Sequence, residues 1–331
     1  MPLPYTEIQP IWTKHDWLGA LAVRCSFGRM NYTVNPGLYA INSPSPEDPV
    51  FVSANYKLSF DHLRRSLKGI AGWILVLDTK GINVWCAAGK GTFGTDELVE
   101  RIATVNLAEV VSHRRLVVPQ LGAPGVAAHE VLKQSGFRVV YGPVRAGDIA
   151  CFLEAKLKAD RDMRRVHFPL LDRLAVIPVE IVGSLQKAGL LAIVFALIAS
   201  RRNGGWAWEH LWQEGLFAGA LTLIGYACVS ALVPALLPWL PGRAFSLKGV
   251  GAGLLAWLPL WAWGPFTTPG DSLPWLLLFM AMGAFMGLNY TGASTYTSLS
   301  GVKKETRRAV PLIIMGVLTA IAVWFWSCGK M

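Results

Sequence analysis

The sequence has few cysteines, and none of them stands close to another. The five cysteines among 331 residues are Cys25, Cys86, Cys151, Cys228 and Cys328. Because no two form a Cys-x-x-Cys pair, this chain alone is not expected to build a zinc ribbon or an iron–sulfur cluster. The odd number and the wide spacing also argue against a disulfide framework and fit a reducing cytosolic face.

Charged residues become scarce after about Arg173. Of the whole chain, 53% is hydrophobic and only 16% is charged, and long apolar runs fill the second half. An 18-residue helix covers roughly 27 Å, just enough to cross the hydrocarbon core of a bilayer. We therefore expect residues 182–331 to form an all-α transmembrane domain of five helices, with spans at about 182–199, 216–237, 249–266, 273–290 and 309–326.

These predicted spans carry almost no ionisable side chains, whereas an ion or proton path usually needs intramembrane charges, which favours an anchor or packing role over transport. Three prolines, Pro234, Pro259 and Pro274, lie in or beside the spans, where membrane helices tolerate them better than soluble ones do.

The formal net charge of +10 does not point to nucleic acid, because the basic residues are scattered or flank apolar segments. Residues 166–181 are expected to be a basic juxtamembrane linker. If the N-terminal domain is cytoplasmic, loops 238–248 and 291–308 lie inside and together carry six Lys or Arg residues. The outside loops carry only two, Arg201 and Arg202. This bias follows the positive-inside rule and predicts a multi-pass protein of the cytoplasmic membrane with Met331 outside. Residues 1–10 lack the pattern of a signal peptide.

The first half of the chain alternates strand and helix signals. Strands are predicted at 50–54, 73–77, 116–118 and 137–141, and helices at 60–68, 96–111, 126–135 and from Asp148 to about 158. Residues 1 to about 50 show no clear pattern. Short connections between alternating elements predict a Rossmann-like α/β domain over residues 1–165, with a mostly parallel sheet. Ligands of such sheets bind outside the carboxyl ends of the strands.

One stretch lies at such a strand end, before a helix expected from Thr95. It reads Asn83-Val84-Trp85-Cys86-Ala87-Ala88-Gly89-Lys90 and is expected to be a loop. Its small residues would let a large flat group approach the backbone, and the lysine and nearby helix N-terminus would favour a thiolate. Without more information, a cysteine there is more often a buried structural residue than a ligand.

The octapeptide resembles the signature of the corrinoid proteins of bacterial mercury methylation (HgcA). Segments 31–40, 54–61 and 119–130 also resemble the large subunit of corrinoid iron–sulfur proteins. The resemblance covers roughly the first half of the chain, and the apolar second half fits the mercury family alone.

This resemblance implies a cobalamin-type corrinoid bound by the α/β domain. Cys86 would be the catalytic residue and the axial ligand of its cobalt. The other corrinoid-binding residues implied are Asn83, Val84, Trp85, Ala87, Ala88, Gly89, Lys90, Gln120, Leu121, Gly122, Ala123, Pro124 and Gly125. The implied reaction is methyl transfer from methyl-Co(III) to Hg(II), forming methylmercury. Because Hg(II) is an electrophile, it needs the methyl group as a carbanion or radical equivalent, and a donating thiolate favours that polarity.

The resemblance also implies partners. The related iron–sulfur subunit carries a four-cysteine cluster motif that this chain lacks, so reducing electrons must come from another protein. The mercury family implies a small ferredoxin with two [4Fe-4S] clusters, and a folate-linked methyl donor that reloads the cobalt.

Several alternatives stay open from the sequence. The chain could be a corrinoid methyl carrier with another acceptor, or a corrinoid-binding membrane module for uptake or sensing, although neither uptake nor sensing needs the axial thiolate. Gly89, Gly91 and Gly94 form a weak dinucleotide fingerprint with Glu109 beyond it. Asn83 could hold the cysteine loop or simply cap a turn, and Trp85 could pack on the corrin ring or fill the core.

Overall fold

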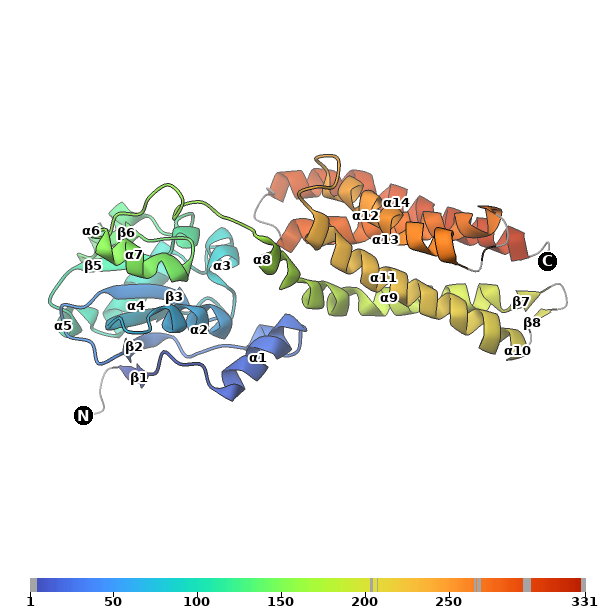
Figure 1. Ribbon diagram of the computed structural model, residues 1–331. Coiled ribbons are helices and arrows are strands. Elements are labelled where there is room, and N and C mark those ends of the chain that lie inside the picture. The colour runs from blue at the N-terminus through green and yellow to red at the C-terminus, as the bar shows by residue number, and fades with distance from the viewer. Residues whose placement is uncertain are drawn as a thin grey trace. The chain divides into compact units, whose positions relative to one another are not determined.

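The computed structural model describes residues 5–202, 205–206, 208–264, 266, 269–293 and 299–328. The chain divides into two compact units, Met1–His167 and Phe168–Met331. Figure 1 shows strands and short helices in the first unit and long helices in the second.

The N-terminal unit is built on a six-stranded sheet in the order β1-β2-β4-β3-β5-β6. Its neighbouring strands pair in parallel, except that β2 runs antiparallel to β4. The predicted α/β fold with a mostly parallel sheet is therefore confirmed. The strands are β1 (Thr6–Ile8), β2 (Gly37–Ile41), β3 (Val50–Ala54), β4 (Gly72–Leu77), β5 (Arg115–Val118) and β6 (Arg138–Tyr141).

Helices cover both faces of this sheet. Alternate residues of a strand point to opposite faces, and β4 is buried at every position because each face has its own core. Leu75 and Leu77 pack with residues of α3 to α6, whereas Ile74 and Val76 pack with α2 and α7. The helices are α1 (Lys14–Arg24), α2 (Lys57–Ser66), α3 (Val84–Lys90), α4 (Thr95–Thr104), α5 (Leu107–Val110), α6 (Ala128–Ser135) and α7 (Ile149–Glu154), with short η1 (Arg29–Asn31), η2 (Gln120–Gly122) and η3 (Ala146–Asp148).

Two local predictions for this unit are wrong, and one stretch has no predicted structure. The helix expected over 96–111 is broken, because Asn106 adopts a left-handed conformation (φ 47°) between α4 and α5. The helix expected to reach residue 158 ends at Glu154, and Lys156 and Leu157 have positive φ just beyond it. The unassigned first 50 residues contain two strands and α1.

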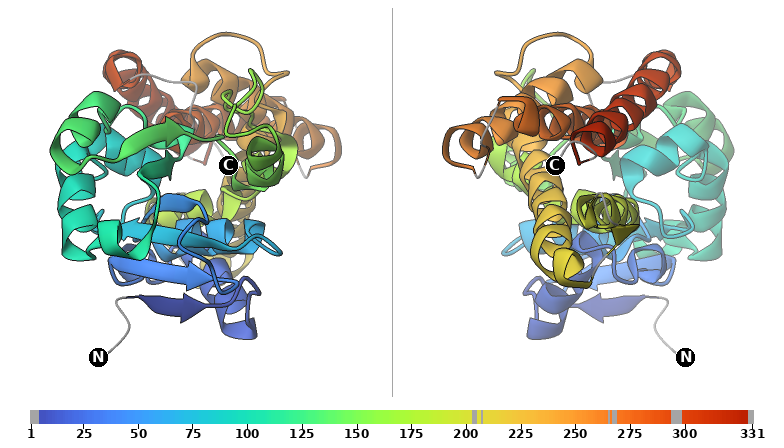
Figure 2. Two further views of the ribbon diagram at one scale, coloured as in Figure 1. Left: turned by 90° about the vertical axis from the view of Figure 1, so that its left-hand side faces the viewer. Right: turned by 90° about the vertical axis from the view of Figure 1, so that its right-hand side faces the viewer.

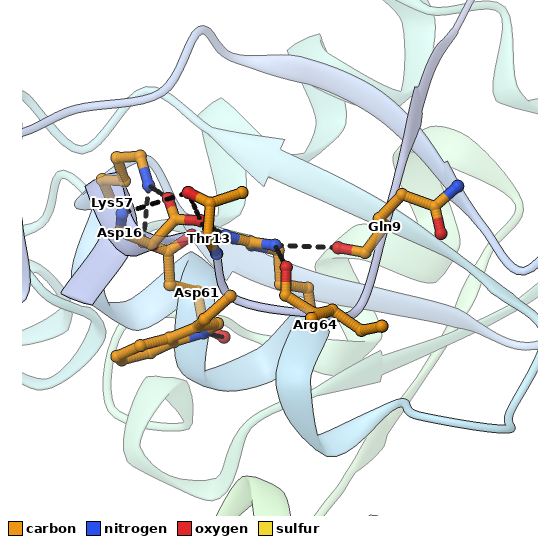
Figure 3. A network of polar contacts seen from close by, with 8 residues as sticks. Gln9, Thr13, Asp16, Lys57, Asp61 and Arg64 are labelled. Atoms are coloured by element: carbon orange, nitrogen blue, oxygen red, sulfur yellow. Dashed lines mark hydrogen bonds and ion pairs between the residues drawn. The ribbon is translucent and has the colours of Figure 1, made fainter.

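A buried ion network ties α1 to α2, and we call Asp16, Lys57, Asp61 and Arg64 the α1–α2 network (Figure 3). Both cations contact both carboxylates, at 2.6 to 2.7 Å, so the charges balance. Burial raises the pKa of the Asp16 carboxyl, but hydrogen bonds from Lys57, Thr13 and Arg64 outweigh it and hold that pKa well below its usual range. The network therefore fastens the N-terminal helix α1 to α2.

Within the residues that the structure describes, the C-terminal unit contains five helices that are long and apolar enough to cross a membrane, as the sequence predicts. These helices lie alongside one another in the views of Figures 1 and 2. They are α9 (Ile177–Ala199), α11 (Leu216–Leu236), α12 (Phe245–Trp263), α13 (Pro269–Ala293) and α14 (Leu299–Cys328). Shorter elements between them are α8 (Leu170–Leu174), β7 (Arg201–Arg202), β8 (Gly205–Trp206), α10 (Trp208–His210) and η4 (Leu211–Gly215).

The basic residues assigned to inside loops lie largely in helices. Lys248 is in the first turns of α12, where its Nζ donates to the carbonyl oxygens of Leu237 and Leu240. The four cations from Lys303 to Arg308 belong to α14, while residues 294–298 of that predicted loop lie outside the described residues. Residues 166–181 contain α8 and the start of α9.

Helices α12 and α13 touch backbone to backbone through glycines. A Cβ on Gly249 or Gly253 would overlap carbonyl groups of α13, and one on Gly283 or Gly287 would overlap carbonyl groups of α12. Each helix presents two glycines four residues apart, the small-residue spacing that lets membrane helices approach closely. This contact makes α12 and α13 one rigid pair.

Arg173 fastens α8 to the end of α11. Its buried Nη1 donates to the carbonyl oxygens of Pro234 and Ala235, at 3.0 and 2.6 Å, and its guanidinium stacks over Trp239. A cation in this place satisfies carbonyls that the helix leaves without partners. The C-terminal unit therefore joins its first short helix to α11 through one side chain.

Candidate functional site

The candidate site lies where the chain changes direction in the sheet. After β3 the chain builds β4 on one side, and then returns to build β5 on the other side of β3. Ligands of open α/β sheets bind outside the carboxyl ends of strands at such a switch point. Helix α3 follows β4, η2 follows β5, and the two contact each other at this edge.

Cys86 lies in the first turn of α3, so the loop predicted around it is wrong. Asn83 is the N-cap of this helix, and its Oδ1 accepts the backbone N–H of Cys86 at 2.9 Å. The helix has seven residues and ends at Gly91, which adopts the left-handed conformation that suits glycine (φ 84°). Asn83 thus caps the helix, and the same hydrogen bond holds the backbone of Cys86. The thiol of Cys86 is free and half-buried.

The two alanines of the octapeptide, and two glycines of the loop after β5, serve packing between protein segments. Ala87 and Ala88 are buried in the core. A Cβ on Gly125 would overlap the carbonyl oxygen of Phe93 and lie 3.1 Å from Cα of Ala88. A Cβ on Gly122 would come within 2.5 Å of the Phe93 ring. Alanine and glycine at these positions let the loop after β5 lie directly against α3.

The other residues of the predicted site differ in exposure. Half-buried positions are Val84, Trp85, Gln120, Leu121 and Ala123, and exposed positions are Gly89, Lys90 and Pro124. Val84 packs against the core beneath α3. The structure therefore brings the two predicted segments together at one edge, with Cys86, Trp85 and Gln120 partly accessible there.

A supporting residue that the sequence interpretation did not single out is Asn55, directly after β3. Its buried Oδ1 accepts three hydrogen bonds, from Thr79 N–H at 3.1 Å, Thr79 Oγ1 at 2.8 Å and Gly81 N–H at 3.0 Å. Glu97 also accepts the N–H of Asp78 at 2.8 Å. These bonds hold the turn between β4 and α3. An Asn at the carboxyl end of a buried strand was the available signal.

Two buried oxygen atoms beside α3 have no hydrogen-bond partner, Gln120 Oε1 and Thr92 Oγ1. Buried polar atoms are nearly always satisfied, so each indicates a missing donor. A corrinoid carries amide side chains around its ring, and these are donors of the required kind. The free thiol of Cys86 is also a soft ligand suited to a transition metal. The residues present therefore fit a corrinoid.

The dinucleotide alternative does not fit this geometry. Gly89 and Gly91 lie at the end of α3, whereas a phosphate-binding glycine turn lies between the strand and the first helix. Among the described residues there is no group of three or more His, Cys, Asp or Glu side chains that could hold a metal ion. Cys25, Cys151 and Cys228 are each unpaired, and the side chain of Cys328 lies outside what the structure describes.

Comparison with known proteins relates this unit to acetyl-CoA-synthesising systems. Residues 26–153 match the family described as the CO dehydrogenase/acetyl-CoA synthase delta subunit. Relatives include the acetyl-CoA decarbonylase/synthase complex subunit gamma of Archaeoglobus fulgidus, 40% identical over 123 residues (37% of this chain, 26% of the relative). Another is the corrinoid/iron-sulfur protein large subunit of Moorella thermoacetica, 27% identical over 126 residues (38% and 28%).

The chain thus matches only about a quarter of the length of these relatives. The predicted relation of its first half to the large subunit of corrinoid iron–sulfur proteins is confirmed. The segment that matches the family, residues 26–153, ends before the first apolar helix, α9.

Proposed function

We propose that this protein is a membrane-anchored corrinoid-dependent methyltransferase that transfers a methyl group to Hg(II), forming methylmercury. The observation that carries the proposal is Cys86, a free, half-buried thiol whose backbone is fixed by Asn83 at the carboxyl edge of the sheet. The similarity to the corrinoid/iron-sulfur protein large subunit over 126 residues supports the cofactor.

The residues of the site would have different roles in binding the corrinoid. Cys86 would hold the cobalt through its sulfur, while the half-buried Trp85, Leu121 and Ala123 would contact the ring. Gln120 Oε1 and Thr92 Oγ1 would accept hydrogen bonds from its amides. Asn83, Val84, Ala87, Ala88, Gly122 and Gly125 would act behind this surface, by holding α3 and the β5 loop together, and Gly89, Lys90 and Pro124 would lie at its rim.

The bound corrinoid supplies a methyl group on cobalt in the polarity that an electrophilic acceptor requires. The protein contributes the position of the donor sulfur. Hydrogen bonds to Asn55 and Asn83 fix the backbone of the turn between β4 and α3 and of the first turn of α3. The sulfur of Cys86 is therefore held in position before the cofactor binds. Soft sulfur also suits a soft substrate metal.

Electrons and methyl groups must reach this site from partners. No group of three or more metal-binding side chains exists in the described parts of the chain, which gives the protein no cluster of its own there. We propose a small ferredoxin with two [4Fe-4S] clusters as the reductant and a folate-linked system as the methyl donor.

We further propose that the corrinoid unit faces the cytoplasm. Four cations, Lys303, Lys304, Arg307 and Arg308, lie in the first turns of α14. Arg243 precedes α12 and Lys248 lies in its first turn, and Arg243 lines one cavity with Lys304 and Arg308, so these two helix ends share one basic side of the bundle. The opposite side carries Arg201 and Arg202. By the positive-inside rule the more basic side is cytoplasmic, and α14 then runs outward. Met331 itself lies outside the described residues.

The test compares Cys86→Ala with Cys151→Ala in the full-length protein. Cys151 is a matched control, because it is another free cysteine of the same unit, exposed on α7. We expect the wild type and Cys151→Ala to bind one corrinoid with a cobalt–thiolate absorption spectrum and, when loaded with methylcobalamin, to transfer its methyl group to Hg(II). Cys86→Ala should lose both properties.

Two outcomes would contradict the proposal in different ways. If Cys86→Ala kept the thiolate spectrum, the axial assignment would be wrong. If the spectrum depended on Cys86 but no methylmercury formed, the protein would be a methyl carrier for another acceptor.

A further inference from the structure

The C-terminal unit contains a cavity of about 830 Å³ bordered by α12, α13 and α14. Its lining is polar at one end and apolar along the rest. It lies among the five apolar helices and involves none of the residues of the corrinoid site.

The polar end of this cavity is cationic. Arg243, just before α12, and Lys304 and Arg308, one turn apart on α14, contribute their side chains to the lining. The carboxylate beside them, Glu305, is already engaged, because its Oε1 accepts Ser246 N–H at 2.6 Å and Ser246 Oγ at 2.8 Å. Among the described residues, no carboxylate pairs with any of these three cations.

The remainder of the cavity is apolar and extends toward the middle of the bundle. Leu247 and Val250 of α12, Met280 of α13, and Leu312 and Ile313 of α14 line it. Leu247 and Leu312 are 54% and 64% exposed, so the cavity is open on the surface that would face lipid. From Lys304 to Ile313 the helix rises about 14 Å, close to the hydrocarbon thickness of one bilayer leaflet, roughly 15 Å.

We propose that this cavity binds one anionic phospholipid from the leaflet at the basic side of the bundle. The phosphate would lie among Arg243, Lys304 and Arg308, and an acyl chain would lie along Leu247, Met280 and Leu312. A zwitterionic lipid would bring its own cation to a site that already holds three, so the charge pattern selects a net negative headgroup. The proposal depends on the helices spanning a bilayer and not on the chemistry at Cys86.

The experiment uses the full-length protein in nanodiscs of phosphatidylcholine containing a tenth of phosphatidylglycerol. Native mass spectrometry after release into mild detergent counts the phosphatidylglycerol molecules that stay bound. The test variant is Lys304→Ala/Arg308→Ala. Its matched control, Lys303→Ala/Arg307→Ala, removes the same two charges from the same turns of α14, at positions that do not line the cavity.

We expect one phosphatidylglycerol on the wild type and on the control, and at least a tenfold lower occupancy on the test variant. Lys304→Arg/Arg308→Lys keeps both charges and should bind phosphatidylglycerol as the wild type does. That result would show that the alanine variant loses binding because it loses the two charges, and not because α14 is misfolded. Glycerol phosphate should not displace the lipid at millimolar concentration, because it lacks the acyl chain.

Equal losses in the test and control variants would overturn the proposal, since they would indicate general surface charge. Equal retention of phosphatidylcholine would overturn the selection for an anion. Displacement of the lipid by glycerol phosphate would show that the cavity binds free anions and not a lipid. A bound peptide mass in place of lipid would show that the cavity binds a protein segment.

Discussion

Replacing Asn55 by Ala tests whether the turn before α3 controls the presentation of Cys86. The change removes the oxygen that accepts Thr79 N–H, Thr79 Oγ1 and Gly81 N–H. Thr79 keeps other acceptors, because its N–H also reaches Leu77 O at 3.1 Å and its hydroxyl reaches Ile82 O at 2.7 Å. The buried N–H of Gly81 has no second acceptor among the described contacts.

One buried donor without a partner costs about 1–3 kcal/mol, which corresponds to a roughly 5- to 150-fold increase in local opening. The turn should therefore open more often while the sheet beneath it stays closed. Hydrogen exchange measured by mass spectrometry on the full-length protein in detergent should show faster exchange from Thr79 to Lys90. Corrinoid binding should weaken in the same variant, because Cys86 is no longer held in place before binding.

The control is Asn42→Gly, which removes two side-chain hydrogen bonds, one part-buried to Leu67 O and one exposed to Ile70 O, at another turn of the same unit. Glycine is chosen because Asn42 has φ 56°, so alanine would add strain. Faster exchange should then appear around residues 67–70 with unchanged corrinoid binding. The reasoning is refuted if Asn55→Ala leaves exchange of 79–90 unchanged, or if both variants weaken corrinoid binding equally.

Two further predictions concern stability. The pKa of the Asp16 carboxyl is lower in the folded protein than in the unfolded chain, where it is about 4. The α1–α2 network therefore stabilises the fold fully above pH ~4, and this stabilisation is lost as the pH falls from there toward the folded pKa. Pepsin cleavage near α1 should therefore rise steeply below pH 4 in the wild type, and Asp16→Asn should be cleaved readily at every acidic pH; identical pH profiles would contradict the network's role. In the membrane unit, Gly283→Val should destabilise the α12–α13 pair by about 1–3 kcal/mol, because its side chain meets the Gly249 carbonyl and lies against Gly253 N. Gly189→Val is the control, since no neighbouring atom lies within 4 Å of its Cβ, and equal thermal inactivation of the two variants in detergent would show that the glycine contact carries no stability.

The sequence by itself determined the elements whose signal is local. The five apolar helices were predictable because a long run of apolar residues identifies a membrane-spanning helix whatever it packs against. The strands from Val50 to Tyr141 were predictable because short apolar runs alternate there with amphipathic helices. The octapeptide at Asn83 indicated the site through its resemblance, since its residues are contiguous.

Local signals failed where one residue decides the backbone. Asn106 breaks the helix expected over 96–111, and Asn83 begins a helix where small residues and glycines had suggested a loop. The early strands β1 and β2 were missed because they are sheet members only through pairing, β2 with β4 and β1 with β2. No periodicity within residues 1–50 reveals a partner that lies thirty or more residues away.

Tertiary structure alone decided which distant residues meet. Asn55 supports the turn before Cys86 because β3 and β4 are neighbours, although 24 residues separate Asn55 from Thr79. Arg243 and Lys304 line one cavity only because α12 and α14 both pack against α13. Helix formation depends mainly on neighbours a few residues apart, whereas edge strands such as β1 and sites such as these depend on the packing of whole elements, which no short window of sequence contains.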